Sequence, residues 1–442
     1  MGRSTDTRRS ADGRTHRRIR RSLARATATL VGVTTPLAAT ISVAAEPWDI
    51  NLGLMSYLEQ DRNTGLEFLL DARRLLANDN ELKLGVELDT LTGATPNGAT
   101  ASNTVQTFTR SSGAGSYTSK AGELPADDTH EDTRLAVSAG YQQQLGNQWQ
   151  IDYDGKISME FDYLSFGLAN AYQYDFNQNN SSLYVGVNAE YNRVHPVGNI
   201  PDALSLMTPE DTEQNRNQAA STRTVLQAAL GWTQVIDTKS LMQIRVTRSH
   251  LEGYLNDPYK LLSMINTDDS DPEIELGSTL AYRFEKRPRI RDTDTVFLEY
   301  KRHLEASIAT VSARHSQDTW DVTADTLELR WRKLLSTGNW IEPHVRWYRQ
   351  SAADFFYHSL SAESELPAFA SADLRLGEYQ AVTVGLSVGM NLGGDSALQL
   401  SAAYYEQNGE SNPDTAVGLQ QEQDLFPTLK VGIFRMIYSV RW

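Results

Sequence analysis

Residues 82–89, LKLGVELD, decide the fold class. Apolar side chains at the even positions alternate with polar or small residues, and residues 183–192, LYVGVNAEYN, repeat the pattern. Because successive side chains of a strand point to opposite faces, each stretch predicts a strand with one face in an apolar phase and one in water. The same period of two recurs at 226–232, 242–246, 327–331, 341–347 and 382–388. No amphipathic helix of about ten residues or more is evident, so we expect an all-β protein.

Short turn signals and long polar connections alternate along the chain. The turn signals lie at 146–147, 177–180, 237–239, 337–339 and 393–395, and the long connections at about 90–131, 195–221, 255–292, 352–375 and 409–427. Outer-membrane barrels have short periplasmic turns and longer external loops, whereas a soluble β-sandwich needs no such asymmetry. We therefore predict a transmembrane antiparallel β-barrel of about 16 strands with both termini periplasmic.

Two stretches bear on the strand count. The weakly alternating segment 277–285 must belong to an external loop for every short turn to fall on one side. The hairpin near 159–162 is the least regular, so barrels of about 14 or 18 strands are the alternatives. Beyond the N-terminus no run of about 18 apolar residues indicates a transmembrane helix.

The first 45 residues have the features of a secretory signal. Six arginines between residues 14 and 25 precede an apolar stretch from Ala26 to Ala44, and Val43, Ala44 and Ala45 form a small-residue cleavage site. We expect cleavage after Ala45, which leaves residues 46–442 as a single outer-membrane barrel domain; a retained membrane anchor is the alternative. Cleavage takes the formal net charge from −15 to about −22. An acidic chain lacks the basic footprint that nucleic-acid phosphates require.

The side-chain inventory predicts neither a metal site nor a cofactor. The chain has no cysteine, which excludes disulfides, thiolate catalysis, iron–sulfur clusters and covalent haem attachment. None of its histidines forms an HExxH motif or a close metal-binding pair. The acidic run 268–275 lacks the spacing of an EF-hand, so we interpret it as a solvated external loop, with weak divalent-cation binding as the alternative.

One catalytic string is present. Residues 385–389, GLSVG, fit the nucleophile-elbow pattern around Ser387, but that mechanism needs a sharp turn from a strand into a helix. Here the string lies inside an alternating strand and no helix follows, so we expect Ser387 to be structural and the protein not to be an enzyme. A surface hydrolase with a Ser–His or His–Asp site assembled across strands is the weaker alternative.

Charged residues on the predicted lumen faces are sorted by sign. The N-terminal half places acids inward, and these are Glu87, Asp89, Asp152, Asp154 and Glu190. The C-terminal half places bases inward, and these are Arg245, Arg330, Arg332, Arg346, Arg435 and Arg441. Opposed charges across a narrow channel create a transverse field that orients dipolar solutes and filters ions. The alternative is that these residues pair with one another and fill a plugged interior.

The C-terminal strand carries the most specific single signal. Apolar and aromatic residues at spacing two precede a final tryptophan, and they are Phe434, Met436, Tyr438, Val440 and Trp442. This resembles the terminal aromatic signature that outer-membrane barrels present to their assembly machinery. We expect these side chains to face lipid, and we expect the barrel-assembly machinery, the outer membrane and lipopolysaccharide as partners.

Several strings resemble an uncharacterised bacterial outer-membrane family of about 400 residues, a domain of unknown function. They are LTGATPNGA at 91–99, DYLS at 162–165, GYLNDPYK at 253–260, EKRPRIR at 285–291 and HVRWYRQSAADFF at 344–356. The family pattern has tyrosines where Trp347 and Phe356 stand. The resemblance implies a barrel but names no substrate. Gene neighbourhoods of relatives imply a link to envelope redox chemistry through thioredoxin-like and flavin-transfer proteins.

Two of these strings have the chemistry of turns. Pro96, Asn97 and Gly98 form one turn signal, and residues 256–258, Asn-Asp-Pro, form another. We interpret both as turns, with a loop folded inward as a plug as the alternative.

The sequence favours a passive or weakly selective pore for small polar solutes, because sixteen strands are enough for an aqueous channel. A non-enzymatic accessory barrel that docks a periplasmic redox protein or a lipoprotein is the second hypothesis. In that case the partner carries the cofactor. A surface hydrolase is the third.

Overall fold

Sixteen antiparallel strands close into one barrel, which confirms the predicted fold class and strand number. The computed structural model describes residues 47–110, 116–207, 215–335 and 338–442, so the predicted signal segment 1–45 lies outside the described residues. The barrel strands, in order around the wall, are β1 (Trp48–Glu59), β2 (Asn63–Leu75), β3 (Glu81–Pro96), β6 (Ala126–Leu145), β7 (Trp149–Met159), β8 (Tyr163–Phe176), β9 (Ser181–Val194), β10 (Ser221–Asp237), β11 (Ser240–Gly253), β14 (Ile290–Leu304), β15 (Ser307–Asp318), β16 (Thr323–Leu334), β17 (Trp340–Gln350), β19 (Tyr379–Gly393), β20 (Ser396–Gly409) and β21 (Leu429–Arg441).

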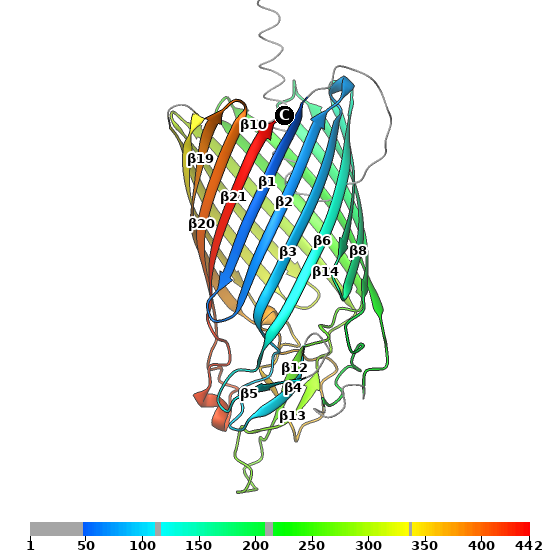
Figure 1. Ribbon diagram of the computed structural model, residues 1–442, viewed down its shortest axis with the longest axis vertical. Coiled ribbons are helices and arrows are strands. Elements are labelled where there is room, and N and C mark those ends of the chain that lie inside the picture. The colour runs from blue at the N-terminus through cyan, green and yellow to red at the C-terminus, as the bar shows by residue number, and fades with distance from the viewer. Residues whose placement is uncertain (1–46, 111–115, 208–214, 336–337) are drawn as a thin grey trace, which may run out of the picture.

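The first and last strands close the wall. β1 pairs antiparallel with β21, with Leu54 opposite Met436, and the backbones of Trp48 and Trp442 exchange hydrogen bonds of 2.7 and 2.9 Å. Closure leaves no strand edge open to pair with another chain. Both described ends of the barrel therefore lie at the same end of the molecule (Figure 1).

The two ends of the barrel differ in their connections. At the end that holds Trp48 and Trp442, called the turn end, the strands are joined by short connections that include 76–80, 146–148, 177–180 and 394–395; the first contains the 3-10 turn η1 (Ala77–Asp79). All the long connections lie at the opposite end. The connection 160–162 between β7 and β8 also lies at this opposite end, although it is short. The least regular predicted hairpin, near 159–162, is therefore part of the wall, and the barrel has sixteen strands.

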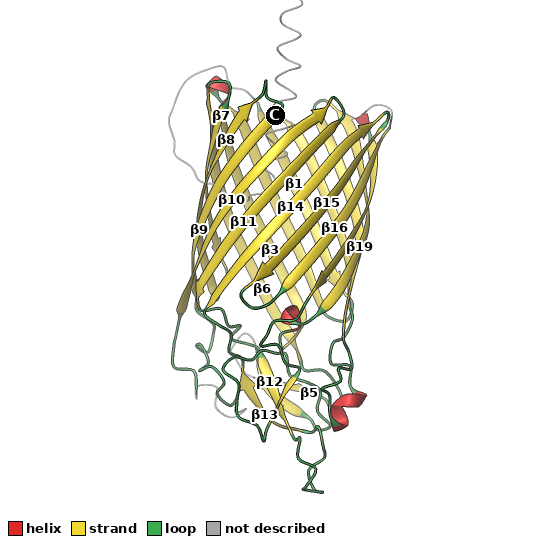
Figure 2. Ribbon diagram, turned by 180° about the vertical axis from the view of Figure 1, so that it is seen from behind, coloured by secondary structure: helices red, strands yellow, loops and turns green. Residues whose placement is uncertain are grey.

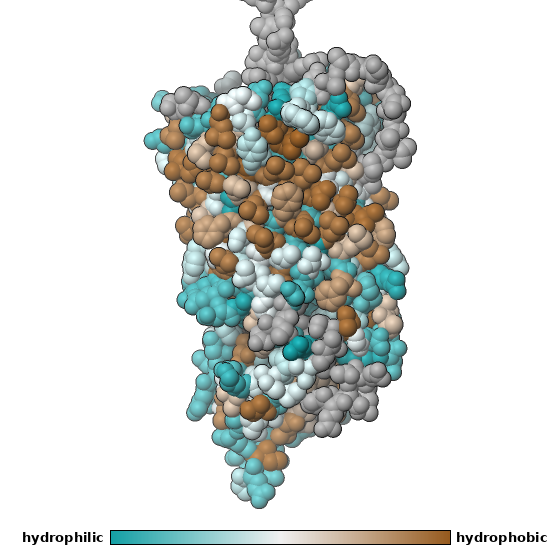
Figure 3. All heavy atoms as spheres, in the orientation of Figure 1, coloured by the Kyte–Doolittle hydropathy of each residue, from teal (hydrophilic) through white to brown (hydrophobic). Residues whose placement is uncertain are grey.

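The outer surface of the wall is apolar. Alternate side chains such as Leu168, Leu230 and Leu327 are 63%, 58% and 53% exposed, although they are large aliphatic groups. Figure 3 shows such side chains gathered across the barrel, whereas the end of the molecule that carries the long connections is more polar. An apolar surface of this extent is stable only against lipid, so the barrel spans a membrane with its strands.

Among the described residues, helical structure is limited to short turns (Figure 2). Within the described parts of the chain, no helix has the length and the apolar character to cross a membrane.

The long connections fold together into a compact body, which we call the cap (Figures 1 and 2). It is built from the described parts of connections 97–125, 195–220, 254–289, 351–378 and 410–428. Its strands are the hairpin β4 (Gln106–Thr109) and β5 (Ser116–Ser119), and a sheet in which β12 (Leu261–Ile265) lies between β13 (Thr279–Phe284) and β18 (Ser359–Ser361). Two 3-10 turns complete it, η3 (Leu374–Leu376) and η4 (Gly418–Glu422).

Two of the buried hydrophobic clusters of the molecule lie in the cap. Phe108 and Leu262 are fully buried there, and the Phe108 ring packs edge-on against Tyr282 at 4.9 Å between centroids. The prediction of plain polar connections at 90–131 and 255–292 is therefore wrong. Residues 261–265, LLSMI, form a strand buried at every position, and a short continuous apolar run is the sequence mark of such a strand. The weak segment 277–285 contains β13 and lies outside the barrel sheet, as predicted.

Candidate functional site

Three of the five acidic residues predicted in the lumen pair with cations on their own side of the wall. Glu87 of β3 reaches across β6 to Lys156 of β7 at 2.6 Å, a contact that only the concave inner face permits. Asp89 pairs with Arg134 at 2.8 Å, and Asp152 pairs with Lys83 at 2.8 Å. The other two acids have different surroundings: Asp154 is buried two residues further along β7, and Glu190 accepts a hydrogen bond from Asn188 at 3.0 Å.

The predicted basic residues have local partners too. Their contacts are Arg330 with Glu328 at 2.5 Å, Arg332 with Glu342 at 2.6 Å, Arg441 with Asp49 at 3.3 Å, Arg245 over the Tyr184 ring at 5.3 Å and Arg346 over the Tyr348 ring at 5.9 Å. Arg435 is exposed on the inner face and has no ion pair with a described residue. Where these residues form ion pairs with described residues, the partners lie nearby and outside the predicted set. The transverse field and the plugged interior both stay predictions.

The weaker catalytic candidates lie apart from one another. Ser387 is buried inside β19, where its hydroxyl hydrogen-bonds the hydroxyl of Ser401 at 2.9 Å. Two His–Asp pairs do form across neighbouring strands, His250 with Asp292 and His315 with Asp325, but they lie on the outer face. Within the described ranges, no group of three or more His, Asp or Glu side chains could hold a metal ion.

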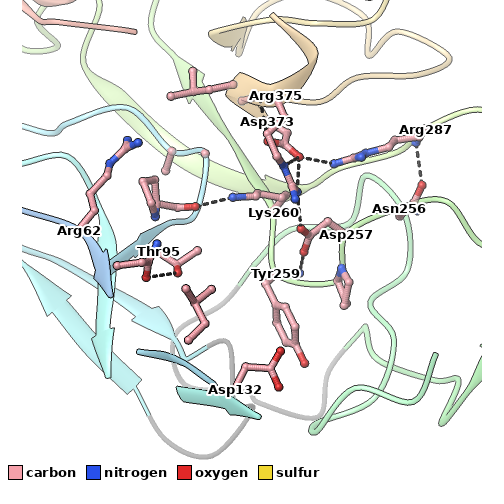
Figure 4. A pocket seen from close by; sticks show the side chains of 18 of the residues that line it. Arg62, Thr95, Asp132, Asn256, Asp257, Tyr259, Lys260, Arg287, Asp373 and Arg375 are labelled. Carbon is pink, nitrogen blue, oxygen red and sulfur yellow. Dashed lines mark hydrogen bonds and ion pairs between the residues drawn. The ribbon is translucent and has the colours of Figure 1, made fainter. Parts of the chain in front are cut away.

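A cavity of about 720 Å³, the chamber, lies between the cap and the adjoining ends of the barrel strands (Figure 4). Its walls carry many charged and phenolic side chains. The barrel contributes Tyr57, Glu59, Arg62, Asp132, Glu160, Asp162, Tyr163 and Arg223, and the cap contributes Tyr254, Asp257, Tyr259, Lys260, Arg287, Asp373 and Arg375. The volume is in the range of small-molecule binding sites.

Buried ion pairs join two connections of the cap beside the chamber. Asp373 is almost completely buried and pairs with Arg287 at 2.8 Å and with Arg375 at 2.5 Å. Arg287 also binds the buried Glu285 at 2.7 Å, and Arg375 reaches Asp257 at 3.0 Å. Asp373 belongs to connection 351–378, whereas Arg287 belongs to connection 254–289. We call these five residues and Lys260 the cap cluster.

The cap cluster extends to the barrel wall through Lys260. Its ammonium group donates to the backbone oxygen of Pro96, the last residue of β3, at 2.5 Å. Burial by itself would raise the pKa of Asp373, but the charges of Lys260, Arg375 and Arg287 outweigh it and hold the pKa well below its usual range. Burial raises the pKa of Glu285, although Arg287 acts in the opposite direction.

The predicted turn chemistry positions this cluster. Asp257 accepts a hydrogen bond from the backbone N–H of Tyr259 at 3.1 Å, and Asn256 accepts one from the backbone N–H of Arg287 at 2.8 Å. The resembling strings at 91–99, 253–260 and 285–291 therefore meet at one place. The strings have turn chemistry, as interpreted, and they also order the cap, which lies outside the barrel mouth and is not an inward-folded plug (Figure 1). Asp373 and Arg375 were not predicted, because no sequence pattern joins them to Arg287, 86 residues away from Asp373.

Solved structures similar to this chain are outer-membrane barrels. The siderophore receptor PirA from Acinetobacter baumannii matches with a TM-score of 0.41 and 11% identity over 84% of this chain and 54% of that chain. The chain thus spans about half the length of that receptor. A bacterial polysaccharide outer membrane secretin matches with a TM-score of 0.44 and 9% identity over 90% of this chain and 100% of the other. A loop L8 deletion mutant of OmpT, an outer membrane protein of Vibrio cholerae, matches with a TM-score of 0.37 and 9% identity over 89% and 98% of the two chains.

The closed barrel with its apolar outer surface is the architecture of an outer-membrane protein. The search of curated proteins found no match. A family model does match, over residues 20–440, which is nearly the whole chain and agrees with the resemblance of the quoted strings. The chain belongs to the family described as "Protein of unknown function (DUF3570)".

Proposed function

We propose that this outer-membrane barrel is a pore for small polar solutes, which enter or leave its lumen through the chamber beneath the cap. The observation that carries the proposal is a chamber of about 720 Å³, lined by many charged and phenolic side chains, at the mouth of a closed 16-stranded barrel. Barrels of this strand number can enclose an aqueous channel. The inner face of the barrel is rich in ion pairs, which favours a water-filled passage and not an apolar ligand cavity.

The proposal includes an orientation. Short turns belong to the periplasmic side of outer-membrane barrels and long connections to the outside. We therefore assign the turn end, with both described chain ends, to the periplasm and the cap to the outer surface. The apolar outer face then contacts lipopolysaccharide and phospholipid, and β21 is the strand offered to the assembly machinery.

A transport role fits the catalytic candidates better than an enzymatic one. Ser387 donates to or accepts from Ser401 within a continuous strand, so it lacks the exposed turn of a nucleophile elbow. The His–Asp pairs face outward at the level of the wall, away from the chamber.

Conductance in planar lipid bilayers tests the pore. We expect discrete openings from the purified barrel in salt solution. Arg435 is exposed in the lumen and has no ion pair with a described residue, so it should contribute to ion selectivity. Arg435→Ser should therefore shift the reversal potential in a salt gradient toward cations. The matched control is Arg349→Ser, because Arg349 lies on the outer face and pairs with Asp325 at 2.9 Å. A correctly folded barrel that never opens would contradict the proposal.

A further inference from the structure

One cation of the chamber, Arg62, has no side-chain partner among the described residues. Arg62, in the short connection between β1 and β2, forms no ion pair and no side-chain hydrogen bond with any described residue, and its Nη2 atom is buried. Figure 4 shows its guanidinium group in the chamber without a dashed interaction. An enclosed cation with unsatisfied donors costs free energy unless acceptor oxygens reach it. Arg62 is therefore a cationic pole of the chamber.

A second group in the same chamber has the opposite charge. Glu160, in the connection between β7 and β8, makes no side-chain hydrogen bond or ion pair with a described residue. Burial raises its pKa to about 7, and the neighbouring carboxylates of Asp132 and Asp162 act in the same direction. Arg134 opposes them without cancelling them, and Asp89 adds a smaller repulsion. The three carboxyl groups of Asp132, Glu160 and Asp162 form an acidic pole.

The two poles lie on the same side of the barrel mouth. Arg62 directly precedes β2, and Asp132 lies on β6, two strands further around the wall. Glu160 follows β7, one strand further again. Neighbouring strands are about 4.8 Å apart, so the wall positions of the two poles are separated laterally by roughly 10–15 Å. Long side chains project from both into one chamber, which leaves a gap suited to a small molecule. Tyr254 Oη and Arg223 Nε, which have no hydrogen-bond partner in the described part of the chain, offer further polar contacts there.

We propose that the chamber binds a small zwitterionic solute, of the amino-acid or short-peptide class, with its carboxylate at Arg62 and its ammonium group at the acidic pole. The inference deepens the proposed pore function and rests on it. Arg62 alone would accept any monoanion, and Glu160 alone any monocation. Only a solute that carries both charges satisfies both poles at once without adding net charge to the chamber.

Equilibrium binding to the full chain in detergent micelles tests the inference. Glycylglycine is the probe, and propionate and propylamine each carry one of its two charges. Calorimetry should show glycylglycine binding about ten-fold or more tightly than either analogue, since each charge-assisted contact contributes that much. Arg62→Gln and Glu160→Gln should each weaken glycylglycine binding by about ten-fold. Arg62→Lys, which keeps the charge, should retain most of it.

The control is Arg349→Gln on the outer face, which should bind as the native chain does. Heat-modifiable migration verifies that every variant is folded. Equal binding of glycylglycine and propionate, or no loss in the two charge-removing variants, would overturn the inference. Absence of binding alongside normal conductance would also overturn it and leave the pore intact. Binding by a barrel that never conducts would instead count against the pore.

Discussion

At the scale of single residues, the chemistry that sets this protein apart from a plain barrel is the burial of charge in the cap. Asp373 has two arginines within 2.8 Å and is almost inaccessible to solvent. Buried ion pairs add little net stability compared with apolar packing, but removal of one partner leaves an uncompensated charge. The cap cluster therefore specifies which connections of the cap contact one another, and it contributes little to net stability.

Asp373→Asn should loosen the cap while the barrel remains closed. The substitution leaves Arg287 and Arg375 without their shared carboxylate, at a cost of about 3–5 kcal/mol to the folded cap. Limited proteolysis should then cleave connections 254–289 and 351–378 faster than in the native chain. The control is Asp354→Asn, because Asp354 is an exposed acid of the same connection whose side chain has no partner among the described residues. Identical cleavage rates in the two variants would show that the cap does not depend on Asp373.

Glu160 should make the stability of the folded chain depend on pH. Its folded pKa of about 7 exceeds the value of about 4.3 for an unfolded glutamate, so the folded state favours the protonated form. The contribution of Glu160 to the stability of the folded chain is therefore fully present below about pH 4 and is lost as the pH rises through about 7. The urea midpoint of the native barrel should fall between pH 5 and pH 8 by more than that of Glu160→Gln. Glu365→Gln, at an exposed cap position, should behave as the native chain. Parallel pH profiles for all three would contradict the assignment.

At the scale of elements, the period of two determines facing but not neighbours. Alternation places Glu87 and Asp89 inward, yet their partners Lys156 and Arg134 depend on the register of β3, β6 and β7, which no local pattern encodes. The strands and turn-end connections could be predicted because each is specified by adjacent residues. The cap could not, because it depends on contacts such as Lys260 with Pro96, 164 residues apart. The buried run 261–265 was the one local signal that indicated it.

The facing of β21 is directly testable. Met436 is opposite Leu54 and Leu400 on the apolar outer surface, whereas Arg435 points into the lumen. Met436→Arg should cost about 2–4 kcal/mol if residue 436 lies near the bilayer midplane, and it should reduce the heat-modifiable, assembled form. Arg435→Ser should assemble nearly as well as the native chain. Equal tolerance of the two substitutions would contradict the register of this strand.

At the scale of the whole molecule, a transmembrane wall carries a separately cored cap over one mouth. Among the described residues, the buried apolar clusters lie in the cap and at the strand ends next to it, whereas the large apolar side chains exposed on the wall face lipid. Motion of the cap can therefore be separated energetically from integrity of the barrel. Under the proposed pore function, passage of solute would depend on whether two cap connections, 254–289 and 351–378, separate to widen the chamber.

A disulfide between these connections distinguishes a moving cap from a fixed one. Lys286 and Ala370 exchange backbone hydrogen bonds of 2.8 and 2.9 Å across them, so their Cα atoms are about 5.5 Å apart, within the span of a disulfide. The chain has no cysteine, so Lys286→Cys with Ala370→Cys creates a single possible bridge. If the connections must part, conductance should fall on oxidation and recover on reduction, and the two single variants should not respond. Unchanged conductance in the oxidised double variant would mean that solutes pass around a static cap, through the chamber as the structure has it.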